Sequence, residues 1–312
     1  DQMLWMDGKG SDGQGPCASD NAAACAGTVR MYDFSLTDIG GQTEAQPEGN
    51  PDAGQAVQPV EAPKTKQEDA VAKCPGKITL AGHGPVSIVP TGWKTLDSFV
   101  PLDVLGDGSL VPHMGSRAYF ADACTAGRYS NQDYMALNLL GKTLRFTANL
   151  SGSGCGCNAA FYLVSMHQNT QASDCHDYYC DANNVCGVSC AEIDIMEANQ
   201  FAWHSTLHTS QDHNGVGVGY GGGGASFSGP RDFSGSQFGP GGSCIDTSKP
   251  FDVDVSFPVD GQGALTAMEV VLSQDGRGCP LKVRISSYAG MAELSAALKA
   301  GMTPVVSYWS SD

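Results

Sequence analysis

Hydrophobic and polar residues alternate with a period of two in several stretches of this chain. Every second residue is apolar between 143 and 150, and again between 251 and 257. Side chains of a β-strand point alternately to its two faces, so the pattern predicts strands with one face on a core. The apolar run 265–272 lies between two Asp-Gly dipeptides, at 260–261 and 275–276, which are typical of hairpin turns. The alternation therefore predicts antiparallel strands.

One stretch instead has the spacing of a helix. Apolar residues stand at 291, 294 and 298, and Gly301 follows at a position suited to ending a helix. The spacing predicts a helix over 291–300. Strands in most of the chain and one short helix together predict an all-β fold, an antiparallel sandwich.

The segment 42–73 differs from everything around it. It is rich in Pro, Glu, Gln and Ala and nearly free of large apolar side chains. Such a segment cannot bury enough surface to offset the entropy lost on ordering. We therefore expect a linker or a long surface loop here.

Composition narrows the function classes. The chain has 312 residues, of which 41% are hydrophobic, 16% are charged and 40 are glycine, which describes a turn-rich protein with a large core. Its formal net charge of −16, without a Lys/Arg cluster, opposes binding to nucleic acid. No run of eighteen apolar residues suits a membrane helix, so we expect a mature, soluble protein with no membrane partner.

Twelve cysteines occur in the chain, and four of them fall between Cys175 and Cys190. A zinc site and disulfide bonds both remain possible for these four. The absence of a CxxC pair and the heavy use of cysteine in an acidic, Gly-rich chain favour disulfides and an oxidising compartment. We expect no metal and no cofactor.

The strongest chemical signal is the run EIDIMEAN, which carries Glu192, Asp194 and Glu197. Glu192 and Asp194 are two apart, so they share one face of a strand, while Ile193 and Ile195 point to the other. Glu197 lies on the wrong face unless a β-bulge resets the alternation. We predict that bulge near Met196.

Three carboxyl groups in one cleft repel each other, which raises at least one pKa and leaves that group protonated near neutral pH. Glycosidic cleavage with retention uses such a pair: an ionised carboxylate attacks the anomeric carbon while a protonated one, about 5 Å away, protonates the leaving oxygen. Here Glu192 is the expected nucleophile, Glu197 the acid/base, and Asp194 a helper that holds Glu192. As bare patterns, acids on one strand face are also explained by solvation or calcium binding.

EIDIMEAN resembles the catalytic motif of glycoside hydrolase family 7, the cellobiohydrolases and β-1,4-endoglucanases. Further similar segments follow in family order: MGSRAYF at 114–120, GCNAAFYLVSM at 156–166, YCDANN at 179–184, FGPGGSCIDT at 238–247 and MTPVVSYW at 302–309. The resemblance implies a concanavalin-like jelly-roll sandwich of two curved antiparallel sheets.

The resemblance also implies roles for individual residues around the three acids. Asn158, Tyr162, Asp181 and Asn183 resemble polar contacts to substrate, and His208 is implied beside the leaving-group subsite. Three more residues lie farther from the acids in the sequence. Arg231 is similar to an arginine that binds sugar hydroxyls, while Trp309 and Trp5 resemble indole platforms on which glucosyl rings stack.

The order of the segments departs from the family. QMLWMDG at 2–8 and GTVRMYDFSLTDIGG at 27–41 resemble the family's C-terminal end, yet they open this chain. We expect a circular permutation in which 1–41 supplies strands that complete the sandwich, 42–73 links the family's usual ends, and 74–312 forms the main part of the same domain. A unit cut from a tandem array is the alternative, which makes other units of such an array candidate partners.

Other departures concern the site. Met196 stands where the family usually has Trp, Ser189-Cys190 replaces a Cys pair, and loop material is missing between Asn184 and Gly187. We therefore expect an open cleft and a secreted, extracellular or cell-wall protein that hydrolyses β-1,4-glucan chains internally with retention. The competing hypothesis is a non-catalytic glycan-binding or wall-structural protein on the same sandwich.

Overall fold

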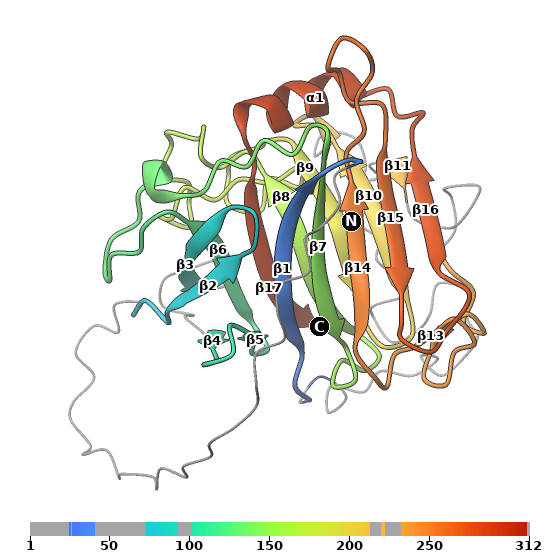
Figure 1. The fold of residues 1–312 in the computed structure, drawn as a ribbon. Helices are drawn as coiled ribbons and strands as arrows, with labels where there is room; N and C mark the ends of the chain where they lie inside the picture. Colours follow the sequence, from blue (N-terminus) through green and yellow to red (C-terminus); the bar gives the residue numbers. More distant parts are fainter. Residues whose placement is uncertain are drawn as a thin grey trace, which may run out of the picture.

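The computed structural model describes residues 25, 27–40, 73–92, 102–212, 220–221 and 232–310. Two large antiparallel sheets lie face to face, with helix α1 (Met291–Ala300) across one end (Figure 1). The predicted all-β sandwich of two antiparallel sheets with a short helix is confirmed. The predicted linker over 42–73 lies outside the described residues apart from Lys73.

The first sheet contains strands predicted from alternation. In order its seven strands are β16 (Leu281–Ile285), β15 (Met268–Ser273), β14 (Phe251–Ser256), β7 (Lys142–Asn149), β1 (Arg30–Asp38), β5 (Leu110–Pro112) and β4 (Leu102–Val104). In β7, β14 and β15 every second side chain is buried and its neighbours are partly exposed. One face of this sheet thus packs on the core and the other meets solvent.

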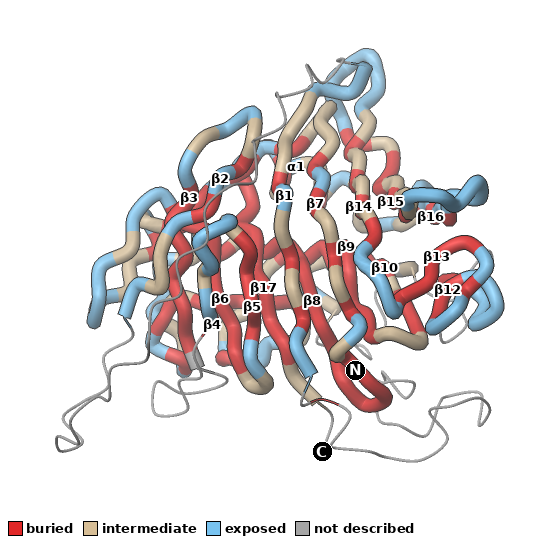
Figure 2. Tube along the Cα trace, turned by 60° about the horizontal axis from the view of Figure 1, so that its bottom comes forward, coloured by how far each residue is buried: buried red, intermediate tan, exposed pale blue. Residues whose placement is uncertain are grey.

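The second sheet carries the acid motif. Its eight strands are, in order, β11 (Tyr220–Gly221), β10 (Trp203–His208), β9 (Glu192–Ala198), β8 (Cys157–Val164), β17 (Thr303–Ser310), β6 (Ser116–Ala121), β3 (Gly84–Gly92) and β2 (Lys77–Leu80). A small parallel pair, β12 (Phe238–Gly239) and β13 (Ile245–Asp246), and the 3-10 turn Asn131–Asp133 complete the described elements with printed bounds. Strands β6, β8 and β9 are buried at every position, which Figure 2 shows as nearly continuous red.

Aromatic rings fill the space between the sheets. Phe34 of β1 contacts Phe146 of β7 and, from the opposite sheet, Phe120 and Phe161, with ring centroids 5.4 to 5.8 Å apart. Helix α1 closes the end of this core with Leu294 and Leu298. Such interlocking rings fix the distance between the sheets and hence the position of β9.

A second cluster of buried residues lies on the far side of the eight-stranded sheet. It combines alternate residues of β6, β8 and β17 with the cysteine-rich segment around 175–186. This layer explains why β8 and β9 are buried on both faces. A strand covered on both sides can hold polar groups away from bulk water.

The two ends of the described chain meet at one place. The Tyr308 hydroxyl of β17 donates to the Cys25 carbonyl at 3.3 Å, and Cys25 forms a disulfide with Cys157 of β8. Cys157 is also the register partner of Ser310, the last described residue. Residues near the start and the end of the chain are therefore neighbours in the fold.

The cysteines form disulfides rather than a zinc site. Bonds join Cys25–Cys157, Cys74–Cys124, Cys175–Cys186, Cys180–Cys190 and Cys244–Cys279. The four cysteines between 175 and 190, for which zinc was the alternative, make two of these bonds. The disulfide prediction is confirmed for them.

Candidate active site

Strand β9 carries the predicted bulge. Its pairing with β8 runs Phe161 to Met196 and then Tyr162 to Asp194, so Ile195 has no partner of its own. The pairing with β10 shifts at the same place. One extra residue reverses the alternation of side chains, which confirms the bulge near Met196.

The bulge brings the three acids to one face. Glu192, Asp194 and Glu197 stand opposite Val164, Tyr162 and Ala160 of β8, which alternate on one face and belong to the second buried cluster. The residues between the acids, Ile193, Ile195 and Met196, belong to the core between the sheets. The acids therefore point away from that core, and each is 6% exposed.

Each acid has its own polar partner. The Ala182 backbone N–H donates to Glu192 Oε2 at 2.9 Å, and the Asn158 amide donates to Glu197 Oε1 at 2.9 Å. Asp194 Oδ2 lies 3.2 Å from His208 Nε2. These contacts hold the carboxyl groups in fixed orientations, as a catalytic pair requires.

Burial sets the protonation of the two glutamates. It raises the pKa of Glu197 to about 8, with the charge of Asp194 adding to the rise and the Asn158 amide and His208 opposing it. Burial, Asp194 and Asp181 also raise the pKa of Glu192 well above its ordinary value, against His208 and the Ala182 N–H. Because two adjacent buried carboxylates repel each other, the favoured state has one of the glutamates protonated.

His208 is more deeply embedded than the sequence indicates. It is 4% exposed, and its second ring nitrogen, Nδ1, lies 3.2 Å from Asp212 Oδ2. Burial alone lowers the pKa of an imidazole, but the bonds to Asp194 and Asp212 outweigh it and raise the pKa of His208 well above its usual value. Sequence reasoning missed Asp212, and its position four residues after His208 was the available signal.

Other predicted substrate-contacting residues share the face of the acids. Asn158 and Tyr162 alternate with core residues on β8, and Trp309 of β17 is the register partner of Asn158. Tyr162 is 5% exposed, and its hydroxyl lies 2.9 Å from that of Tyr179. Trp309 is partly exposed beside them.

Asp181 and Asn183 flank the residue that binds Glu192. Asp181 accepts a hydrogen bond from the Val185 backbone N–H at 3.0 Å, and burial raises its pKa. Asn183 is partly exposed. Trp5 and Arg231, which were also predicted to contact sugar, lie outside the described residues.

Two disulfides hold the segment that faces Glu192. Cys175–Cys186 and Cys180–Cys190 close short loops around residues 181–185. A bridge between Asp181 and Ser189 and a bond from the Cys190 N–H to the Asp181 carbonyl tie this segment to the start of β9. The N–H of Ala182 is thereby fixed against the expected nucleophile.

A buried ion pair lies under the same face. Arg117 of β6 pairs with Asp177 at 3.3 Å, and both side chains are fully buried. The guanidinium lies over the Tyr179 ring, 3.7 Å from its centroid, while the Tyr119 hydroxyl donates to Asp177 at 2.6 Å. The sequence contained Arg117 in MGSRAYF but gave no sign of its partner sixty residues away.

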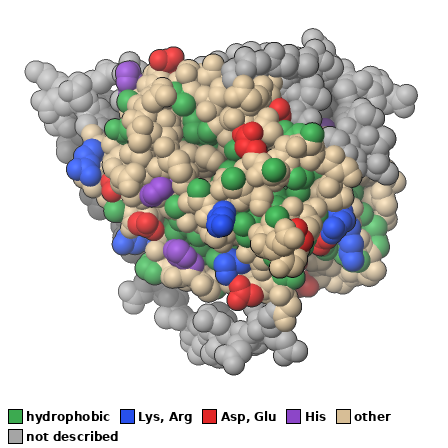
Figure 3. All heavy atoms as spheres, turned by 90° about the horizontal axis from the view of Figure 1, so that it is seen from above, with side chains coloured by type: hydrophobic (Ala, Val, Ile, Leu, Met, Phe, Trp, Pro, Cys, Tyr) green, Lys and Arg blue, Asp and Glu red, His purple; other side chains and the backbone are tan. Residues whose placement is uncertain are grey.

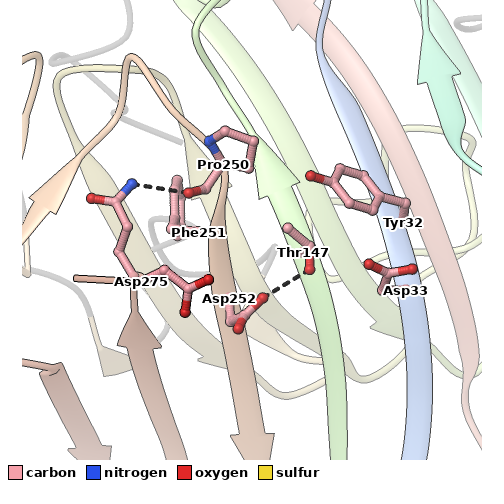
Figure 4. A pocket seen from close by; sticks show the side chains of 8 residues that line it. Tyr32, Asp33, Thr147, Pro250, Phe251, Asp252 and Asp275 are labelled. Atoms are coloured by element: carbon pink, nitrogen blue, oxygen red, sulfur yellow. Dashed lines mark hydrogen bonds between the residues drawn. The ribbon is translucent and has the colours of Figure 1, made fainter. Parts of the chain in front are cut away.

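A second group of acids lies on the opposite side of the sandwich. Tyr32, Asp33, Thr147, Asp252 and Asp275, with Pro250, Phe251 and Gln274, line a hollow of about 260 Å³ on the outer face of the seven-stranded sheet. In Figure 4, Tyr32 and Asp33 stand on one flank and Asp252 and Asp275 on the other. This hollow is open and polar, and it is separated from β9 by the core.

Charge is dispersed over the surface. Figure 3 shows Lys and Arg side chains in small separate groups among polar atoms on the face seen from above. In the described part of the chain, no helix is both long and apolar enough to cross a bilayer.

The sequence was compared with known proteins. No protein-family model matches the chain. Endoglucanase EG-1 of Hypocrea jecorina is 29% identical over 259 residues, covering 70% of this chain and 51% of that protein. Endo-beta-1,4-glucanase celB of Emericella nidulans is 27% identical over 307 residues, covering 77% of this chain and 71% of that protein. The chain spans about half the length of the Hypocrea relative.

Solved structures give weaker likenesses. An endoglucanase I complexed with cellobiose has a TM-score of 0.45 at 21% identity, covering 63% of this chain and 62% of that one. A Humicola insolens endocellulase EGI has a TM-score of 0.44 at 21% identity, covering 76% and 67%. The chain is a cellulase-like protein related in sequence to the endoglucanases of glycoside hydrolase family 7, as its motifs predicted.

Proposed function

We propose that this protein is a retaining, endo-acting hydrolase of β-1,4-glucan chains. The observation that carries the proposal is the bulge in β9, which places Glu192, Asp194 and Glu197 on one face while Glu197 keeps a pKa of about 8. A protonated and an ionised carboxyl on one face are what retaining cleavage requires. The names of the related endoglucanases support the choice of substrate.

The reaction divides the roles between the two glutamates. Glu192 attacks the anomeric carbon, and the bond to the leaving oxygen breaks as Glu197 protonates that oxygen. The product is a glycosyl ester on Glu192. Glu197, now ionised, removes a proton from water, which attacks the anomeric carbon and releases Glu192.

The remaining residues prepare this step. The Ala182 N–H and the charge of His208 favour the ionised form of Glu192. Asp194 holds His208 beside the pair. Asn158 orients Glu197, while Tyr162, Asp181, Asn183 and Trp309 provide polar and aromatic contacts for glucosyl units, with Trp5 and Arg231 as further proposed contacts.

The wider setting forms part of the proposal. Five disulfides among the described residues suit a secreted protein acting outside the cell or in a wall. The partner is a β-glucan polysaccharide rather than nucleic acid or a membrane. Residues 1–41 and 74–312 form one permuted domain linked by 42–73, and further units of a tandem array remain candidate partners.

Hydrolysis of an aryl cellobioside tests the activity. We expect the wild type to release the chromophore and Glu192→Gln and Glu197→Gln to lose about 10²- to 10⁴-fold in kcat. Asp252→Asn, which changes an acid on the outer sheet face, is the matched control with unchanged kcat. A rapid fall in the viscosity of soluble cellulose identifies internal cleavage.

The competing function is glycan binding without catalysis. The specific observation in its favour is that the chain spans about half of the Hypocrea relative. If the wild type is as inactive as Glu192→Gln while both still bind soluble β-glucan, the hydrolase proposal fails and the binding function stands.

A further inference from the structure

The imidazole of His208 lies between two carboxylates. Nε2 is 3.2 Å from Asp194 Oδ2, and Nδ1 is 3.2 Å from Asp212 Oδ2. The side chain of His208 is 5% exposed and that of Asp194 is 8% exposed, so water does little to separate the charges. The ring is therefore in contact with an anion at each end.

This geometry requires a particular protonation state. A neutral imidazole has one N–H donor and one lone pair, so one of its nitrogens would turn a lone pair toward a carboxylate. The imidazolium donates at both nitrogens and satisfies both acids. The two-sided contact thus selects the charged ring.

Asp212 is itself held in place from several sides. Its Oδ1 accepts a bond from the Thr209 hydroxyl at 2.9 Å, and its Oδ2 accepts one from the Tyr288 hydroxyl at 3.2 Å. The Thr209 N–H donates to Tyr288, and the Ser210 N–H donates to Glu293 of helix α1 at 2.7 Å. The turn that carries Asp212 is therefore anchored to the helix end of the sandwich.

The charges that face His208 are almost all negative. Strand β9 contributes Asp194, Glu192 and Glu197, the turn after β10 contributes Asp212, and the loop before α1 contributes the neutral Tyr288 hydroxyl next to Asp212. The bonds from His208, Thr209 and Tyr288 outweigh burial and lower the pKa of Asp212, which keeps it anionic. Asp212 is the charge at the end of the ring remote from the catalytic acids.

We propose that Asp212 is a positioning residue: it clamps the ring of His208 against Asp194 and keeps that ring an imidazolium, the positive charge that lets Glu192 work in its ionised form. This role rests on the proposed hydrolase function. Without Asp212, the ring loses the contact that stabilises its second proton. The net negative charge near Glu192 then rises, which disfavours the ionised nucleophile.

The charge state of His208 can be measured without any substrate. Proton NMR of histidine-labelled protein follows each of the seven imidazoles during a pH titration, and the signal lost in His208→Asn identifies His208. In the wild type we expect His208 to stay protonated well above the pH at which exposed histidines titrate. In Asp212→Asn, its midpoint should fall by about one to three pH units, the usual effect of one opposite charge.

Activity supplies the second readout. Asp212→Asn should lower kcat on the aryl cellobioside most at the alkaline end of the pH–rate profile, with KM nearly unchanged. Tyr288→Phe, which keeps both carboxylates but removes one bond to Asp212, should shift the His208 midpoint in the same direction by less. Asp252→Asn is the control that should move neither quantity.

The outcomes separate this role from the hydrolase function. An unchanged His208 midpoint in folded Asp212→Asn overturns the clamp, whatever the activity. If Asp212→Asn fails to fold, an unshifted midpoint in Tyr288→Phe overturns it instead. A wild type without activity but with the expected shift removes the catalytic meaning while leaving the clamp in place.

Discussion

Two strands of this molecule carry acids two residues apart, and the acids meet different surroundings. In β14, Asp252 and Asp254 alternate with core residues and remain partly exposed on the outer face of their sheet. In β9, Glu192 and Asp194 follow the same alternation but are almost completely buried. The alternation of acids on a strand thus does not by itself make a reactive site.

What differs is the layer that covers the strand. Asp254 meets the guanidinium of Arg145, which is 51% exposed, so water screens the pair. The acids of β9 lie under a second buried cluster that includes Tyr162 and the disulfide-bonded segment around Cys180. Reactivity comes from this additional layer, because it removes the water that keeps ordinary carboxyls ionised.

The bulge is the feature whose loss should have the largest effect. Deleting Met196 restores plain alternation and turns Glu197 toward the apolar core between the sheets. A buried charge without a partner costs about 3 kcal/mol or more, so we expect a protein that folds poorly or not at all. Circular dichroism and urea unfolding measure the effect.

Deletion of Gln262 is the control for the missing residue. It lies in an exposed turn after β14, where a shorter loop costs little. A Met196 deletion as stable as the Gln262 deletion would contradict the importance of the bulge.

The two arginine pairs should differ by a smaller but clear amount. Arg117→Met leaves Asp177 as an unpaired buried charge and should lower the free energy of unfolding by about 3–5 kcal/mol. Arg145→Met breaks an exposed pair and should cost at most about 1 kcal/mol. Urea denaturation of both variants gives the difference, and equal losses would refute the contrast between the two faces.

The stability of the protein should also depend on pH through Glu197. Below pH 4.5 both the folded and the unfolded chain hold this proton, while between 4.5 and about 8 only the folded chain keeps it. The free energy of unfolding should therefore fall as pH rises through this window, by at most about 1.4 kcal/mol per pH unit. Glu197→Gln should flatten the slope in urea titrations at several pH values, whereas Asp254→Asn should leave it in place.

Restoring the family order of segments should change stability least. The described ends meet at Cys157, through the Cys25 disulfide and the pairing with Ser310. Joining Asp312 to Asp1 and opening the chain within 42–73 should give a folded protein with a nearly unchanged thermal midpoint. An unfolded product would count against the permuted domain.

Much of the fold follows from local pattern. Alternation identified β7, β14 and β15, and the spacing around Leu294 and Leu298 identified α1. The five-residue step from Glu192 to Glu197 predicted the bulge, because only a changed register reconciles it with one face. These features depend on neighbours along the chain, which a sequence displays.

The polar surroundings of the site were harder to predict. Asp212 contacts His208 only because the turn after β10 is anchored to Tyr288 and Glu293, far along the chain. Arg117 and Asp177 come from segments that periodicity does not connect. Pairing among several cysteines likewise has many solutions in sequence and one in space.

The short disulfide loops around Ala182 make the acid pair sensitive to redox conditions. Reduction of Cys175–Cys186 and Cys180–Cys190 would free the segment that donates to Glu192, while the sheets themselves are held by ladders and aromatic packing. A reducing environment would then disable the nucleophile before it unfolds the sandwich. The oxidation state of four cysteines is in this sense part of the charge on one glutamate.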